Sequence, residues 1–282
     1  MISSRELDGK RKSYRSILGI VKAMKALSAA NVRKGGVVLE NTRLCRDFID
    51  SAAAVAPSLP GVTIKKAGPN KMLVAFGSQY GLCGAFNERV LEAVYQAEAK
   101  LGCVAWVVLM GRRLAERAPD QICCKPVLKL EAPGSVDGID DAIGDLLTVI
   151  YDKYRCGEFD EIYFIYPSFA AEMLSMNLKL VLPPEFESTG EEPPMMYLAP
   201  PELLEGLLRE HLSIHLYATI LETLIAENES RMRSMDFASK NIQKKIDEAT
   251  QSYNYALQEE VTGELLEIIG GYEAIRKGAE GV

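Results

Sequence analysis

The sequence predicts an α/β protein in which the N- and C-terminal helices form a long antiparallel coiled coil and a central domain has a doubly wound, Rossmann-like fold. Two segments without proline, residues 1–56 and 202–282, flank the centre of the chain. Both carry an apolar heptad pattern, which is typical of helices that pair along their length. Between them, short apolar runs alternate with helix-like stretches, which indicates a sheet with helices on its faces.

The N-terminal segment has a narrow heptad seam. Its a positions are Leu7, Tyr14, Val21, Ser28, Gly35, Thr42, Ile49 and Ala56. Its d positions are Lys10, Ile17, Met24, Asn31, Val38, Cys45 and Ala52. Small and polar side chains on a seam allow two backbones to approach closely, but they bury little apolar area. A helix of about fifty residues is roughly 75 Å long, too long for one compact domain.

The C-terminal segment shows the same kind of seam. Its a positions are Ala218, Ile225, Met232, Ser239, Ile246 and Tyr253, and its d positions are Leu221, Asn228, Met235, Ile242, Ala249 and Ala256. The register then shifts to Leu257, Val261, Leu265 and Ile268, a change that alters supercoiling locally. A helix over 202–269 is roughly 100 Å long. We therefore expect three domains: a helix over 1–57, an α/β domain over 70–195, and a helix over 202–276 that pairs with the first.

The central segment supplies the strands. Three apolar runs predict strands over 71–76, 103–110 and 162–166, the last ended by Pro167. Weaker candidates are 123–130 and 175–182, the latter alternating as an edge strand does. Helices are expected over 87–101 and 140–154, and the proline-rich stretch 183–201 reads as an exposed connection.

Composition and charge limit the classes of function. A hydrophobic share of 48% allows a normal core, and we expect no direct membrane span because no run of 18 apolar residues occurs. The N-terminal residues lack a secretory signal pattern, which predicts a cytosolic protein. Residues 5–34 hold nine basic side chains and two acidic ones, so this segment is at +7 and the remainder at −14. Such a helix suits an acidic protein or an anionic surface, and we expect no nucleic acid partner.

Few residues could carry chemistry. A glycine-rich turn over 77–87 follows a predicted strand and precedes a helix, so its N–H groups could cradle a phosphate. It lacks the spacing of a nucleotide-binding loop, and a tight turn with Cys83 packed beneath it is the favoured interpretation. His211 and His215 share a helix face and read as surface or packing residues, while the six cysteines read as free buried thiols. We expect no catalytic residue, no metal and no cofactor.

Three ordered motifs nevertheless identify a relationship. Residues 22–30, K-A-M-K-A-L-S-A-A, resemble the K-A-M-K-M-V-[AS]-A-A stretch of the gamma subunits of rotary F-type ATP synthases. Residues 80–87, Y-G-L-C-G-A-F-N, resemble that family's R-G-L-C-G-G-[LF]-N loop. Residues 229–271 follow the family's last helix in order and spacing. The set covers essentially the whole chain.

The resemblance implies a non-catalytic shaft for ATP synthesis and hydrogen ion transport. In this family the paired helices reach into the ring of alpha and beta subunits, while the α/β domain forms a foot on the membrane ring of c subunits beside the epsilon subunit. The implied location is the cytoplasmic side of a prokaryotic cell membrane, peripheral and within the complex. By position, the implied contacts with the catalytic ring are Lys22, Met24, Lys25, Arg231, Gln258 and Thr262. Tyr197, Glu202 and Glu205 lie where the family touches its membrane ring. The heptad geometry places Arg231 beside a core position and exposed.

Some positions depart from the family pattern. Leu257 stands where an arginine pairs with the glutamine, which removes a bidentate cation from that contact. Gln79 and Tyr80 replace an aspartate and an arginine, and Asp236 stands where a lysine is usual. These departures suggest a divergent branch, such as a second ATPase system.

Two other classes of function stay open at this point. One is a doubly wound ligand-binding protein or enzyme with helical appendages, in which the turn over 77–84 would bind a phosphate. The other is a coiled-coil scaffold unrelated to ion transport. Neither accounts for the three ordered motifs.

Overall fold

A computed structural model describes residues 4–61, 68–102, 104–119, 121–122, 125–170, 173–184 and 196–279. The chain divides into two compact units. Unit 1 joins Met1–Ala26 to Met235–Val282, and unit 2 is Leu27–Ser234. No helix within the described residues is long and apolar enough to cross a bilayer.

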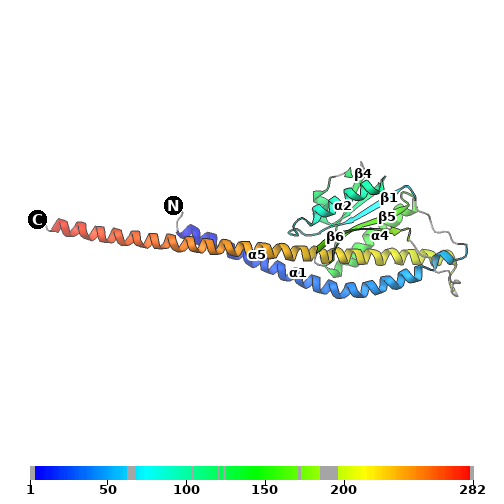
Figure 1. The fold of residues 1–282 in the computed structure, drawn as a ribbon, viewed down its shortest axis with the longest axis horizontal. Helices are drawn as coiled ribbons and strands as arrows, with labels where there is room; N and C mark the ends of the chain where they lie inside the picture. The colour runs from blue at the N-terminus through cyan, green and yellow to red at the C-terminus, as the bar shows by residue number, and fades with distance from the viewer. Residues whose placement is uncertain are drawn as a thin grey trace. The chain divides into compact units, whose positions relative to one another are not determined.

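Two long helices pass through both units. Helix α1 spans Ser4–Ala53 and α5 spans Pro200–Ala279. The prolines at the start of α5 are tolerated because the first N–H groups of a helix have no partner within it. Figure 1 labels the two helices, with α1 in blue and α5 running from yellow to red.

In each unit the two helices run antiparallel. In unit 1 the Arg11 guanidinium lies 4.5 Å from the centre of the Tyr253 ring. In unit 2 the Asn31 side-chain amide donates to that of Asn228 at 3.3 Å. A Cβ at Gly35 would lie only 2.7 Å from Ile225 Cγ1, so glycine is what lets the backbones approach there. The antiparallel helix pair expected from the heptads is thus present in each unit.

The heptad seam is confirmed on α5, where every a and d position from Ala218 to Ala256 is buried or half-buried. On α1 the a positions from Val21 to Thr42 are buried. Three of its predicted d positions are wrong, since Lys10, Ile17 and Cys45 are all exposed. Leu18 is buried instead of Ile17. A straight helix of 3.6 residues per turn drifts away from a strict 3.5-residue repeat, which moves the inner side chain by one position.

The centre of unit 2 is a six-stranded sheet of order β3-β4-β2-β1-β5-β6. Its strands are β1 Lys71–Phe76, β2 Val104–Met110, β3 Gln121–Ile122, β4 Lys125–Leu130, β5 Glu161–Ala170 and β6 Met173–Leu182. The four inner strands are parallel, with Leu73 opposite both Val107 and Tyr163. The outer strands β3 and β6 are antiparallel to their neighbours. Residues 72–76 of the central strand β1 are all buried, as expected for a strand covered on both faces.

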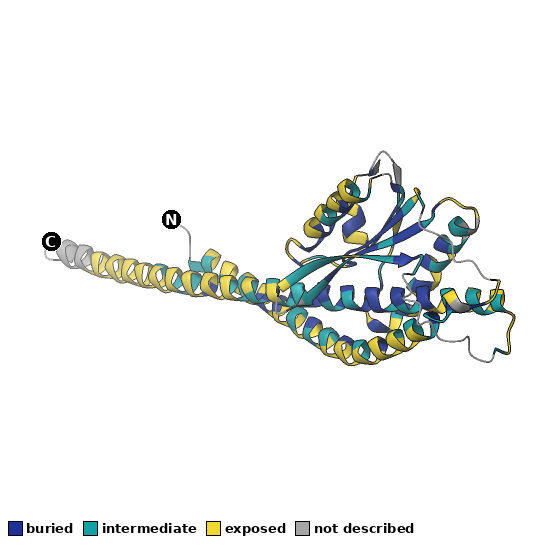
Figure 2. Ribbon diagram, turned by 45° about the vertical axis from the view of Figure 1, so that its right-hand side comes forward, coloured by how far each residue is buried: buried dark blue, intermediate teal, exposed yellow. Residues whose placement is uncertain are grey.

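Helices cover both faces of the sheet, as a doubly wound fold requires (Figure 2). The β1 side chains of Met72, Val74 and Phe76 pack in a core with α4 (Ile139–Arg155) and with α5 residues such as Leu216. The alternate β1 side chains, Leu73 and Ala75, pack with α2 (Phe86–Leu101) and α3 (Arg112–Arg117). Short 3₁₀ turns occur at Ala56–Ser58 and Val136–Gly138. The predicted α/β class is confirmed, and α5 is itself one of the helices that cover the sheet.

Strand β5 differs from the sequence prediction. It does not end before Pro167 but continues to Ala170, with Pro167 opposite Met176 in β6. Strand β1 pairs with β5 only as far as Ile165. At Pro167, therefore, one edge of β5 has no paired strand among the described residues. Proline, which has no backbone N–H to donate, is tolerated at such an edge. Helix α3 and strand β3 were not predicted, and Cys103, Cys123 and Cys124 lie outside the described residues.

Candidate functional site

The glycine-rich turn over 77–85 lies at the carboxyl end of β1 and leads into α2. Asn87, in the first turn of α2, holds it: its Oδ1 accepts from the Ser78 N–H at 3.0 Å and its Nδ2 donates to Ser78 Oγ at 2.8 Å. Gly111 has φ 121°, and a Cβ there would lie 2.8 Å from the Gly77 carbonyl oxygen. Glycine at Gly111 therefore lets the ends of β1 and β2 close together, a conformation that other residues rarely adopt.

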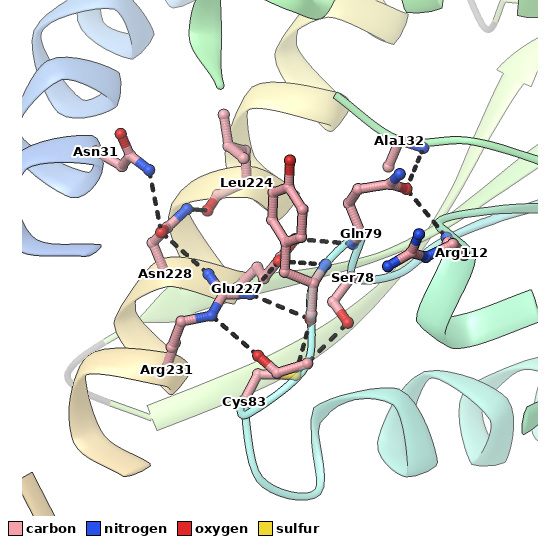
Figure 3. Close-up of polar contacts among 12 residues, drawn as sticks. Asn31, Ser78, Gln79, Cys83, Arg112, Ala132, Leu224, Glu227, Asn228 and Arg231 are labelled. Carbon is pink, nitrogen blue, oxygen red and sulfur yellow. Dashed lines mark hydrogen bonds and ion pairs between the residues drawn. The ribbon is translucent and has the colours of Figure 1, made fainter. Parts of the chain in front are cut away.

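Two buried charged residues of α5 fasten this turn (Figure 3). The Glu227 carboxylate accepts from the backbone N–H groups of Gln79 and Tyr80, each at 3.2 Å. The Arg231 guanidinium donates to the Tyr80 carbonyl at 3.2 Å and to the Gly81 carbonyl at 3.1 Å, and it pairs with Glu227. Glu227 is 2% exposed and Arg231 is 5% exposed. We call Glu227, Arg231 and the backbone of residues 79–81 the loop clamp.

Gln79 extends the loop clamp to two further strands. Its Oε1 accepts from the backbone N–H of Arg112, just after β2, at 3.1 Å, and from that of Ala132, just after β4, at 3.0 Å. Its Nε2 donates to Glu131 at 3.4 Å. One side chain thus joins the carboxyl ends of β1, β2 and β4.

The loop clamp fills the place where a phosphate would bind. Doubly wound folds bind ligands in the crevice beyond the carboxyl ends of their strands. Here the N–H groups that could cradle an anion already bind the Glu227 carboxylate. The cavity that remains between β1, β2 and α5 is about 10 Å³, room for roughly one water molecule. The geometry therefore argues against the phosphate-binding alternative.

The electrostatics of this region agree with a structural role. Burial raises the pKa of Glu227, while the Arg231 guanidinium and the two N–H groups oppose that rise. Burial also raises the pKa of Cys83, whose thiol lies 3.5 Å from Ser78 Oγ. A thiol with a raised pKa is protonated at neutral pH and is a poor nucleophile. Cys83 therefore packs beneath the turn, as the sequence favoured.

Comparison with known proteins gives the family. A sequence profile of the ATP synthase family matches residues 3–275. The ATP synthase gamma chain of Erythrobacter litoralis is 30% identical over 300 residues, covering 98% of this chain and all of the relative. That of Pelotomaculum thermopropionicum is 29% identical over 295 residues with the same coverage. The chain belongs to the ATP synthase gamma-chain family.

Solved structures share the fold. A chain in the Euglena gracilis mitochondrial ATP synthase, in its OSCP/F1/c-ring part, superposes with a TM-score of 0.64 at 18% identity, covering 98% of this chain and 95% of that one. One in the central stalk and c-ring of the Tetrahymena thermophila mitochondrial enzyme has a TM-score of 0.55 at 18% identity, covering 78% and 99%. Gamma chains are the central-stalk rotor subunit of F-type ATP synthase and have no catalysis of their own.

The catalytic-ring contacts expected from the resemblance that fall in unit 1 lie on both long helices. Lys22 is exposed on α1, whereas Met24 and Lys25 are half-buried. Gln258 and Thr262 are exposed on α5, one turn apart, and the Thr262 hydroxyl donates to the Gln258 carbonyl at 2.7 Å. Of these side chains, Lys25 forms an ion pair within the chain, with Asp236.

The predicted exposure of Arg231 is wrong. Its guanidinium is buried in the loop clamp and also donates to Asn228 Oδ1 at 3.1 Å. Sequence reasoning missed its partner Glu227 altogether. The available signal was an acid and a base four residues apart on one face of an otherwise apolar helix, a spacing that brings side chains together.

The remaining candidates lie in unit 2. Tyr197 is 95% exposed just before α5, and Glu202 and Glu205 are exposed in its first turns. Beside them is a groove of about 430 Å³ between α4 and α5, lined in part by Tyr151, Tyr154 and Glu205.

Of the two interpretations of His211 and His215, packing residues is the one that holds, since both are buried against Asp50. The expected burial of two cysteines in this unit is wrong. Cys45 and Cys156 are free thiols as expected, but both are exposed.

Asp236 gives a testable pH effect in unit 1. Its hydrogen bonds with Lys240 and Lys25 lower its pKa to about 2. A carboxyl group with a lowered pKa stabilises the folded form above its unfolded pKa, and this contribution is lost as the pH falls through about 2. We expect Lys25→Met to raise the Asp236 pKa part of the way toward the ordinary 3.8, followed by carboxyl ¹³C NMR. Lys22→Met, on the exposed side of the same helix, is the control. An unchanged Asp236 pKa in Lys25→Met would show that the ion pair does not form in solution.

Proposed function

We propose that this chain couples ion-driven rotation of a membrane ring to the conformational cycle of the catalytic subunits in an F-type ATP synthase. The observation that supports this most directly is the loop clamp. A rotor must pass torque from its foot domain into its shaft without slipping. In the clamp the buried Glu227 carboxylate accepts from two backbone N–H groups, and the buried Arg231 guanidinium donates to two carbonyls, which fastens the sheet to α5. Hydrogen bonds that involve a charged group are stronger than those between neutral groups.

Apolar packing supports the same role within unit 2. Leu216, Ile220 and Leu224 of α5 belong to the core that covers one face of the sheet. Close-packed interiors transmit strain because they are nearly incompressible. Sheet and helix in this unit are therefore suited to turn as one body.

The proposed partners follow the family resemblance. Alpha and beta subunits of the catalytic ring would contact Lys22, Met24, Lys25, Gln258 and Thr262. We assign Arg231 to the loop clamp, because its donors are engaged within the chain. The ring of c subunits would lie against Tyr197, Glu202 and Glu205, beside the groove between α4 and α5. The epsilon subunit would lie beside this foot. The proposed location is peripheral, on the cytoplasmic side of a prokaryotic cell membrane.

The alternative functions have less support. A ligand-binding protein or enzyme would have to displace Glu227 from the turn to free its N–H groups for an anion. A coiled-coil scaffold unrelated to ion transport does not require a loop clamp. Nucleotide titration of the isolated chain distinguishes the first, since we expect no sub-millimolar binding of ATP or ADP.

Co-purification of the tagged chain from its host tests the function. We expect recovery with catalytic and non-catalytic ATPase subunits, together with ATPase activity. Recovery of the chain alone, or with unrelated partners, would contradict the proposal.

The foot residues can be tested in the same complex. We expect the double charge reversal Glu202→Lys, Glu205→Lys to weaken attachment to the membrane ring by about tenfold or more. Reversing two charges places like charges across the interface. A repulsion of about 1.4 kcal/mol already lowers the affinity tenfold. ATPase activity of the detached complex should persist. Sedimentation of membranes at fixed ionic strength measures the attachment. Glu92→Lys, an exposed residue of α2, is the matched control. Equal attachment in both variants would remove these two residues from the proposed contact.

A further inference from the structure

A carboxylate and two imidazoles meet where α1 and α5 lie together in unit 2. Asp50 Oδ1 lies 2.9 Å from His211 Nδ1 and 3.0 Å from His215 Nε2. These three atoms all lie within 4.8 Å of one another. The histidines are four residues apart on α5, so one face of the helix presents both.

A neutral His211 ring cannot satisfy both of its oxygen neighbours. Its Nε2 lies 3.3 Å from the Val181 carbonyl oxygen in β6, and its Nδ1 lies 2.9 Å from Asp50 Oδ1. Both oxygens accept hydrogen bonds, but a neutral imidazole carries only one ring hydrogen. A metal ion bound at Nδ1 leaves the hydrogen on Nε2 for Val181 and satisfies both contacts, and a second ring proton would do the same.

We propose that Asp50, His211 and His215 form a binding site for a divalent transition metal of the zinc class, which joins α1 to α5. Metal-ligating histidines usually donate their second ring N–H to a carbonyl or carboxylate, and the Val181 carbonyl is placed to accept from His211 Nε2. Bonds of about 2.0–2.2 Å in a tetrahedral site separate neighbouring ligand atoms by about 3.3–3.6 Å. The distances of 2.9 and 3.0 Å need an expansion of about half an ångström to reach this. Asp50 is 38% exposed, which leaves water access to a fourth position.

Lys179 of β6 lies on the other side of the His215 ring. Its Nζ is 3.1 Å from His215 Nδ1. When a metal takes His215 Nε2, the hydrogen of the neutral ring stands on Nδ1 and faces Lys179. An ammonium group so close to a ligand also repels a metal ion, so Lys179 should weaken metal binding.

Titration of the full-length chain with Co²⁺, followed by its visible absorption, and with Zn²⁺ in competition with a chromophoric chelator tests the site. We expect one metal per chain, with affinity lowered about a hundredfold or more in His215→Gln and in Asp50→Asn, because each loses a direct ligand. Asp47→Asn, an exposed neighbour on α1, should bind as the wild type does. Metal bound by exposed thiols persists in all variants and sets the background. Binding by the wild type no tighter than by Asp50→Asn, in chains with the same helix content, would overturn the proposal.

Lys179→Met separates a metal site from a buried proton network. If a metal binds, removing the nearby ammonium should tighten Zn²⁺ binding about tenfold, because it removes a like charge beside the ligand His215. Zinc should also raise the unfolding temperature of the wild type but not that of Asp50→Asn. A Lys179→Met chain that binds no more zinc than Asp50→Asn would show that the cation between Asp50 and His211 is a proton.

Discussion

Arg231→Met should destabilise unit 2 by about 3–5 kcal/mol, because it leaves the buried Glu227 carboxylate without its cation. It also leaves the Tyr80 and Gly81 carbonyls without their donor. The turn over 77–85 should then detach from α5. Without Arg231, the Glu227 carboxylate is a buried charge that only two backbone N–H groups stabilise, and burial disfavours its ionised form. Hydrogen exchange of the amides of Gln79 and Tyr80, together with urea unfolding, measures both effects.

Arg233→Met is the matched control, two residues further along the same helix. The Arg233 guanidinium lies over the Phe169 ring at 4.8 Å, and its side chain is exposed. An exposed contact of this kind contributes about 0.5–1 kcal/mol, so the control should remain close to the wild type. If both variants lost the same stability, the loop clamp would not be the link between sheet and shaft. In the assembled enzyme, we expect Arg231→Met to reduce rotation-coupled ATP synthesis more than Arg233→Met does.

The long helices and the inner strands could be predicted because their signals are local. Heptads without proline locate α1 and α5, and an unbroken apolar run locates β1. The elements that were missed lack such a signal. Helix α3 has six residues, too few to show a hydrophobic period. Strand β5 continues through Pro167 because its pairing with β1 ends at Ile165, and the sequence alone does not show where that pairing ends.

The candidate site was predicted only in part, for a related reason. The glycine-rich turn is visible in the sequence, but Glu227 lies 148 residues beyond Gln79. The heptad on α5 predicts one buried face, toward α1. From His211 to Arg231, however, α5 packs against both α1 and the sheet, so most of its circumference is buried. A charged residue beside the seam, such as Arg231, is then internal, and the same double packing explains the buried histidines.

Deleting residues 258–282 should separate folding from coupling. Every residue of α5 from Leu257 to Tyr272 is exposed (Figure 2). The large apolar side chains among them are Leu257, Val261, Leu265, Leu266, Ile268, Ile269 and Tyr272. The chain itself buries none of these side chains, so removing those from Val261 to Tyr272 should change its free energy of unfolding by no more than about 0.5 kcal/mol. Apolar side chains grouped in this way on a surface mark a contact with another protein.

That contact is where the deletion should act. Burying even two such side chains in a partner contributes about 3–6 kcal/mol. Their loss should therefore leave the chain able to assemble, but with a weakened contact between the end of α5 and the catalytic ring during rotation. We expect ATP synthesis driven by an ion gradient in reconstituted vesicles to fall far more than ATP hydrolysis by the same complexes. Deleting only residues 270–282 is the matched control, because it keeps the apolar side chains from Leu257 to Ile269 and should retain most of the coupling. Equal loss of coupling in both deletions would place the contact with the catalytic ring beyond Ile269. Full coupling in both would mean that α1 and the rest of α5 carry the contact with the catalytic ring.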